Sequence, residues 1–277
     1  MSSKINNLFS EVNNVPQIAE VIRVIINQLS DPDIDLKKVA KNVEKEQIIS
    51  SKVLRIVNSA SFGLAKKIST IEEAVVLLGM VKLKTLVIAS GIVSSVPKIE
   101  DFDVKQFWLD SFSTATYARW LANAGGCNAD IAFTAGLLSS LGTILIHLGQ
   151  PKEALEIEQL IKEGGHSRLF LENMRLGFSS QDVSAELCKF WKFSDELIIP
   201  IAQSGNPLLA DSTSKIACSV YIARQISICN AAKMTKEETL PLIHPEIIQK
   251  LGFPDVFFEE KLGDIMALES GLDGLLE

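Results

Sequence analysis

Apolar residues recur at helical spacing along nearly the whole chain, and this pattern constrains the fold more than any other feature. No stretch sustains the strict alternation of apolar and polar residues that a half-buried strand requires. In the run after Pro16, apolar side chains three or four positions apart would line one face of a helix: Ile18, Val21, Ile22, Ile25 and Leu29. The sequence therefore predicts an all-α protein built from many helices.

With 277 residues, the chain is long enough for one large domain or two lobes. Its 47% hydrophobic and 22% charged residues are the balance typical of a folded protein. The segment 94–103, SSVPKIEDFD, combines small residues, a proline and acidic residues, and it is the best boundary. We therefore expect an N-terminal helical lobe over residues 1–97. A second helical lobe over residues 104–277 is predicted to end in short acidic helices.

The clearest local signals lie in the segment 51–91. An apolar helix runs into Asn58-Ser59, whose side chains can bond the backbone where that helix breaks. In Ser69-Thr70 each hydroxyl is followed three residues later by a Glu, which predicts two capping boxes at the start of the next helix. Gly79 then ends that helix. We interpret Asn58-Ser59 as a structural motif rather than a ligand site.

This order of elements closely resembles the HDOD family, which comprises helical bacterial signalling domains related to the HD metal-dependent phosphohydrolases. The residues that carry the resemblance here are Leu54, Asn58-Ser59, Phe62-Gly63, Ile68-Ser69, Glu73-Ala74 and Leu78-Gly79. The resemblance extends over about residues 16–225 and is weak after Ser204. It implies an HD-like multi-helix bundle with an N-terminal helical lobe, the two forming one HDOD domain.

The resemblance also locates the metal site of an HD hydrolase, which needs a His, an adjacent His-Asp pair and a later Asp to hold a divalent ion. The first His position falls on Asp110, and the His-Asp pair falls on Ser139-Ser140. A further pair found in some relatives falls on Gln203-Ser204, and the terminal Asp falls near Val220. Because only one of these positions carries a carboxylate, the resemblance implies no metal, no cofactor and no catalysis.

Other catalytic arrangements are absent from the sequence. The three histidines, His147, His166 and His244, lie too far apart to form a helical ligand pair, and we expect His147 to be a hydrogen-bonded core residue. Ser139-Ser140 is predicted to lie inside one apolar helix over residues 129–148 and to allow close packing rather than to supply a nucleophile. The four cysteines form no CxxC pair, and no glycine-rich phosphate loop occurs.

The charge is unevenly distributed. Residues 1–100 hold 13 Lys or Arg and 10 Asp or Glu, whereas the whole chain has a net charge of −7. The acidic remainder disfavours nucleic acid and anionic membranes as partners. Lys37, Lys41 and Lys45 share one face of a predicted helix, which is either a solvated face or a docking patch for an acidic partner.

Neither export nor membrane insertion is predicted. The first 17 residues lack an apolar core and a small-residue cleavage site, which favours a cytoplasmic protein. Residues 131–151 contain no Asp, Glu, Lys or Arg, but polar side chains interrupt this run and no basic cluster flanks it. We interpret it as part of the core of a soluble bundle.

From the resemblance we expect a non-catalytic signal-transduction module that regulates by binding a protein partner in trans. Two alternatives remain open. One is a sensor of a small molecule or nucleotide second messenger that uses the cavity of the lost metal site. The other, weaker one is a residual metal-dependent phosphohydrolase.

Overall fold

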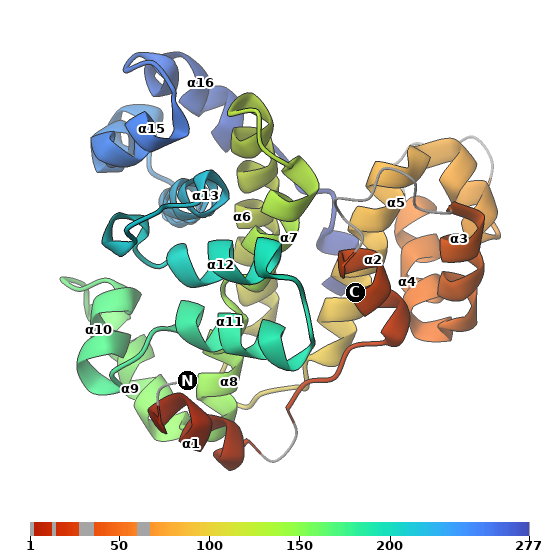
Figure 1. The fold of residues 1–277 in the computed structure, drawn as a ribbon, viewed down its shortest axis with the longest axis horizontal. Coiled ribbons are helices and arrows are strands. Elements are labelled where there is room, and N and C mark those ends of the chain that lie inside the picture. The colour runs from red at the N-terminus through yellow and green to blue at the C-terminus, as the bar shows by residue number, and fades with distance from the viewer. Residues whose placement is uncertain (1–2, 13–14, 28–35, 60–66, 277) are drawn as a thin grey trace. The chain divides into compact units, whose positions relative to one another are not determined.

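The computed structural model describes residues 3–12, 15–27, 36–59 and 67–276, without the side chains of residues 36–39. These residues form α-helices and short 3₁₀ helices joined by turns, and no strand occurs among them (Figure 1). The predicted all-α fold class is therefore confirmed.

The chain divides into two compact units. The large unit comprises residues 1–15 and 98–268, and the small unit comprises residues 16–97 and 269–277. The boundary at residue 97 falls inside the predicted segment 94–103. Both ends differ from the predicted lobes 1–97 and 104–277, because each terminal segment packs with the other unit.

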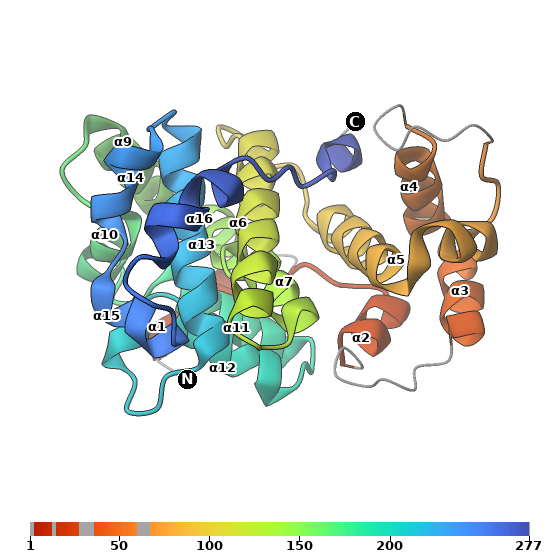
Figure 2. The ribbon, with the colours of Figure 1, turned by 90° about the horizontal axis from the view of Figure 1, so that it is seen from above.

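The small unit packs four helices and one short 3₁₀ helix that comes from the end of the chain. These elements are α2 (Glu20–Asn27), α3 (Leu36–Lys45), α4 (Gln47–Val57), α5 (Ile71–Ser95) and the 3₁₀ helix η4 (Asp273–Leu276). Helix α5 contacts all the others (Figure 2). Its Gly91 has no room for a Cβ atom, because the side chain of Ile22 packs directly against the glycine backbone.

Asn58 ends α4, and its side chain binds the backbone of Leu54 and of Ile68. Its Nδ2 donates to the carbonyl oxygens of Leu54 at 2.7 Å and Ile68 at 2.8 Å. Its Oδ1 accepts from the N–H of Ile68 at 2.7 Å. The side chain of Asn58 thus has the structural role that its position in the sequence predicts. Phe62-Gly63 lies outside the described residues.

Helix α5 starts with one capping box rather than the predicted two. Thr70 Oγ1 accepts from the N–H of Glu73 at 3.1 Å, and the Glu73 carboxylate accepts from the N–H of Thr70 at 3.3 Å. The same carboxylate also accepts from the N–H of Ser69 at 2.7 Å. A second capping box built on Ser69 would need this N–H as the donor to Glu72, and it is already bound to Glu73. Gly79 has φ 74° and ψ 166°, so the helix breaks there as predicted.

Three helices of the large unit, α6, α7 and α13, pack against one another (Figure 2). Its helices are α1 (Ser3–Glu11), α6 (Val104–Ala124), α7 (Ala129–Leu138), α8 (Leu141–Gly149), α9 (Pro151–Glu163), α10 (Arg168–Arg175), α11 (Ser180–Phe190), α12 (Asp195–Gln203), α13 (Lys215–Ala231), α14 (Lys236–Thr239), α15 (Pro245–Leu251) and α16 (Phe257–Met266), with 3₁₀ helices η2 (Pro207–Leu209) and η3 (Leu240–Leu242).

The single helix predicted over residues 129–148 is wrong, because the chain turns at Ser139-Ser140 between α7 and α8. Helix α11 supplies the physical reason. Ser184 Oγ donates to the carbonyl oxygen of Ser139 at 3.0 Å and accepts from the N–H of Gly142 at 2.7 Å. Gly142 must be a glycine, since a Cβ atom there would collide with the carbonyl oxygen of Ser180. The predicted close approach of a neighbouring backbone is therefore found.

Two segments, Ile71–Ser95 and Ala129–Gly149, are long and apolar enough to cross a membrane by length and composition alone. The structure buries 56% of the apolar window in the first segment and 89% in the second. Gly79 interrupts the first and Ser139-Ser140 the second. The second segment thus lies in the core of the large unit.

Asn58→Ala should lower the free energy of unfolding by about 1–3 kcal/mol, because it removes the side-chain partners of the partly buried N–H and carbonyl groups of Ile68. Denaturant titration followed by circular dichroism measures this loss. The control is Asn173→Ala, whose side chain makes one exposed bond to Leu169 and whose effect should stay within about 0.5 kcal/mol. Unchanged stability together with lost partner binding would contradict the structural role.

Candidate functional site

The predicted metal-site positions all lie in the large unit, on different elements. Asp110 is half-buried on α6, and Ser139-Ser140 forms the turn between α7 and α8. Gln203-Ser204 ends α12, and Val220 is fully buried on α13.

Ser139 is fully buried, and its hydroxyl donates to the carbonyl oxygen of Gly136 at 2.9 Å. The carbonyl oxygen of Ser139 accepts from Ser184 Oγ and, at 3.5 Å, from Gln181 Nε2. The turn is therefore bonded to α11. These contacts support a packing role for Ser139 and not the role of a nucleophile or metal ligand.

Gln203-Ser204 closes a loop. Gln203 Nε2 donates to the carbonyl oxygen of Ser212 at 2.9 Å, and its Oε1 accepts from the N–H of Ser214 at 2.8 Å. Ser204 is buried, and its hydroxyl donates to the carbonyl oxygen of Ile201 at 2.8 Å. Both side chains thus hold the connection from α12 to α13.

A charged cluster that the sequence analysis missed lies beside these positions, centred on Arg168 at the start of α10. Arg168 Nη2 donates to both carboxylate oxygens of Glu158, at 2.7 Å and 2.8 Å. Arg168 Nη1 lies 3.8 Å from Oε1 of Glu172, one helical turn further along α10. The spacing of Arg168 and Glu172 was visible as an ordinary helical ion pair, but it did not identify Glu158 as the main partner.

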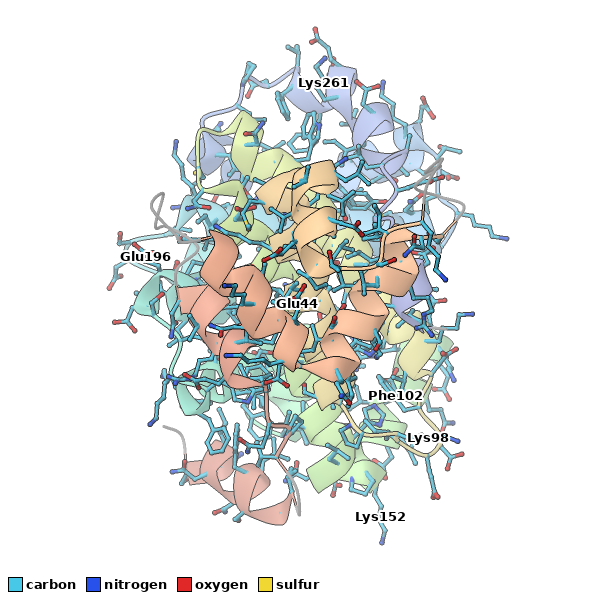
Figure 3. All side chains as sticks on the ribbon, turned by 90° about the vertical axis from the view of Figure 1, so that its right-hand side faces the viewer. Glu44, Lys98, Phe102, Lys152, Glu196 and Lys261 are labelled. Atoms are coloured by element: carbon cyan, nitrogen blue, oxygen red, sulfur yellow. The ribbon has the colours of Figure 1, made fainter. Side chains whose placement is uncertain are left out.

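His147 belongs to the same cluster. It is 4% exposed, and its Nε2 lies 3.2 Å from Oε1 of Glu158. Its ring packs on Phe102, with 4.2 Å between the ring centroids; Figure 3 labels Phe102. The prediction of a hydrogen-bonded core histidine at His147 is confirmed.

The cluster shifts the pKa values of its carboxylates in opposite directions. Burial acts to raise the pKa of Glu158, but hydrogen bonds and charge from His147 and Arg168 outweigh burial and lower this pKa to about 2. Glu172 is 1% exposed, and burial raises its pKa despite Arg168 and the N–H of Ser180, which donates to its carboxylate at 2.6 Å. Glu172 is thus the carboxylate whose charge the protein compensates less.

Asp110, the one carboxylate among the predicted metal-site positions, is electrostatically coupled to Arg168. Burial is the main reason why the pKa of Asp110 is raised; a hydrogen bond from Gln106, at 2.8 Å, and the charge of Arg168 act in the opposite direction. The carbonyl oxygen of Asp110 accepts from Ser227 Oγ at 3.2 Å, which ties α6 to α13. The charge of Arg168 therefore acts on Asp110 against the effect of burial.

A second arginine reaches the same region from α13, one helical turn after Val220. Arg224 Nη2 donates to the carbonyl oxygen of Ser204. Desolvation lowers the pKa of Arg224 to about 10, although the charge of Glu172 acts to raise it. Its Nη1 is buried and has no hydrogen-bond partner among the described protein groups. Such a buried donor requires an acceptor from elsewhere, a water or another molecule.

These residues do not fit a metal ion. Among the residues that the structure describes, no group of three or more His, Cys, Asp or Glu side chains could hold one. Arg168 and Arg224 both act on Glu172, and fixed positive charge at this place opposes the approach of a divalent cation. The arrangement can hold a buried carboxylate between two guanidinium groups, and it offers one free donor at Arg224.

The predicted lysine patch lies on α3 of the small unit. Lys41 and Lys45 are exposed, and Lys45 Nζ lies 3.4 Å from Oδ1 of Asn42. Glu44, labelled in Figure 3, is exposed on the same helix and reduces the net positive charge. The side chain of Lys37 lies outside the described residues. The docking role of this patch stays a prediction.

Glu158→Gln should flatten the acid dependence of stability. With a pKa lowered from 4.5 to about 2, Glu158 contributes its full stabilisation above pH 4.5. This contribution is lost as the pH falls towards 2, because the unfolded state binds the proton first. The wild type should therefore lose up to roughly 3 kcal/mol more than the variant between about pH 5 and pH 2.

Unfolding titrations at several pH values measure this difference. The matched control is Glu156→Gln on the same helix, whose carboxylate is 60% exposed and pairs with Arg175. That control should keep the wild-type pH dependence, because an exposed pair contributes little. Identical pH profiles for Glu158→Gln and the wild type would show that the cluster does not hold Glu158 ionised.

Comparison with known proteins identifies relatives of known family. The sequence model described as "HDOD domain" matches residues 15–207. A solved structure from Shewanella amazonensis, which carries a provisional phosphohydrolase name, is 30% identical, with a TM-score of 0.78 over 97% of this chain and 96% of that one. An HDOD domain protein of unknown function from Geobacter sulfurreducens is 22% identical, with a TM-score of 0.81 over 99% and 97% of the two chains.

Two curated proteins match over part of their length. An uncharacterized protein of Treponema pallidum is 25% identical over 194 residues, which are 69% of this chain and 38% of that protein. The cyclic di-GMP phosphodiesterase CdgJ of Vibrio cholerae is 24% identical over 200 residues, which are 62% of this chain and 45% of that protein. The chain thus spans less than half the length of both.

Proposed function

This chain belongs to the HDOD family, a signalling-associated domain, and from that premise we propose that it is a non-catalytic regulatory module that binds a protein partner in trans. One observation carries the proposal. The positions that would hold the metal of an HD hydrolase are instead engaged in packing and in backbone hydrogen bonds, at Ser139-Ser140 and at Gln203-Ser204.

Charge supports the same proposal. A hydrolase of this kind needs a divalent ion to activate water and polarise phosphate, whereas Arg168 and Arg224 place two cations around Glu172. The catalytic name of CdgJ belongs to that protein as a whole, and this chain matches 45% of its length. We therefore assign this chain a binding function, and on its sequence alone we assign it to the cytoplasm.

The partner that we propose is a protein. The net charge of −7 opposes binding to nucleic acid and to anionic membranes. The excess of Lys and Arg in residues 1–100 provides a basic region within this acidic chain. An acidic protein surface is the partner that this charge distribution favours.

The test is metal content together with hydrolysis. Untagged protein dialysed against Mn²⁺ or Fe²⁺ and then against metal-free buffer should retain far less than one ion per chain by elemental analysis. It should not hydrolyse phosphodiesters. Ser139→His combined with Ser140→Asp should bind no metal and should lose stability, because Ser139 is fully buried. About one ion per chain with chelator-sensitive turnover would overturn the proposal.

A second candidate function, a small-molecule sensor, is favoured by one observation: the buried Nη1 of Arg224 has no partner among the described protein groups. A ligand with an acceptor atom, such as a carbonyl, carboxylate or phosphate oxygen, would satisfy it. Native mass spectrometry should then show an added mass on the purified chain that disappears in Arg224→Met. The control is Arg175→Met, whose guanidinium pairs with Glu156 at the surface and whose loss should leave the added mass.

A further inference from the structure

The segment 269–276 leaves the large unit and packs on the small unit, where we call it the tail. Its side chains alternate in burial. Leu272 and Leu275 are each 2% exposed, whereas Glu269, Gly271 and Asp273 are exposed. Two leucines three residues apart thus anchor a short segment whose other face is in solvent.

The tail holds its own shape with few bonds. Ser270 Oγ donates to Oδ1 of Asp273 at 3.0 Å and accepts from the N–H of Leu272 at 3.1 Å. The N–H of Leu275 donates to the carbonyl oxygen of Leu272 at 2.9 Å. These three bonds join residues of the tail to one another.

The surface beneath the tail belongs to α4 and α5. Gly274 packs on Ile56, a fully buried residue of α4, and Arg55 Nη2 lies 3.4 Å from the carbonyl oxygen of Gly274. Lys52 lies one turn before Arg55; burial, and then the charge of Arg55, lower its pKa. This part of α4 therefore joins an apolar surface to two basic side chains.

The two sides carry charges of opposite sign. The tail contains Glu269 and Asp273, whereas α4 contains Lys52 and Arg55. A long hydrogen bond joins them, from Arg55 Nη2 to the carbonyl oxygen of Gly274 at 3.4 Å. Two leucines and this weak bond must offset the entropy lost when the whole tail is ordered, so a competing segment with similar leucines can replace it.

We propose that the α4–α5 surface under the tail is a protein-docking site, and that the tail is its built-in competitor. The fitting partner is an acidic segment with two leucines three residues apart. This inference rests on the proposed function, since it locates the protein-binding surface of that module. It differs from the predicted patch on α3, because Leu272 and Leu275 identify an apolar anchor that Lys41 and Lys45 do not supply.

The experiment uses the chain without residues 269–277 and a fluorescent synthetic peptide of that sequence. Fluorescence anisotropy should show saturable binding to the truncated chain and at least tenfold weaker binding to the full chain, in which the tail competes. A peptide with both Leu272→Ser and Leu275→Ser should not bind. In the truncated chain, Arg55→Glu should weaken binding at least fivefold, whereas Arg23→Glu, which changes an exposed residue paired with Glu20, should not.

Truncation can also disturb folding, so a second variant keeps the full length and carries Leu272→Ser with Leu275→Ser to undock the tail. If either variant is folded by circular dichroism and fails to bind the peptide, the docking site is overturned. If neither variant folds, the tail is a fixed part of the small unit, and the proposal is overturned as well.

The two proposals fail in different ways. Peptide binding is measured without any native partner, so it stands even if the chain proves to be a hydrolase. Conversely, a protein partner whose affinity is unchanged by tail removal and by Arg55→Glu would leave the proposed function intact and overturn this docking site.

Discussion

The hydroxyl group of Ser184 is the contact on which the rest of the large unit depends. It accepts from the N–H of Gly142 and lies within bonding distance of the carbonyl oxygen of Ser139, so it replaces helical bonds at the break between α7 and α8. Its place one turn into α11 brings Ser180 against Gly142, where no side chain fits. Ser180 in turn binds Glu172 through its N–H. Ser184 and Ser180 of α11 thus join the turn at Ser139-Ser140 to the charged cluster.

The charged cluster supplies positive charge to a buried carboxylate. A buried carboxylate such as Glu172 costs several kcal/mol in desolvation unless a nearby positive charge compensates it. In an HD hydrolase the ion provides such charge, whereas here Arg168 and Arg224 provide it. Removing one member of a buried set of charged side chains costs more than replacing the whole set by apolar side chains, because the charges that remain lose their compensation. Replacing Arg168 or Arg224 alone is therefore unfavourable.

Local features of the fold could be predicted from the sequence, and contacts between distant segments could not. Asn58 and the Thr70–Glu73 capping box involve residues within ten positions of each other, and both were visible as patterns. The break at Ser139-Ser140 was missed because the run is uniformly apolar and the groups that replace its helical bonds come from Ser184. The cluster around Arg168 was missed for the same reason, since Glu158 lies on the preceding helix.

The position of the tail also depends on contacts between distant segments, and it bears on regulation. Leu272 and Leu275 anchor the tail, but no nearby residue in the sequence indicates which surface receives them, and that surface proves to lie on α4 and α5. An acidic segment held there by few contacts lowers the apparent affinity of any partner by the fraction of chains in which it is docked. A partner must then bind more tightly than the tail, or the tail must be released first. Such competition is a physical means by which binding itself becomes the regulated step.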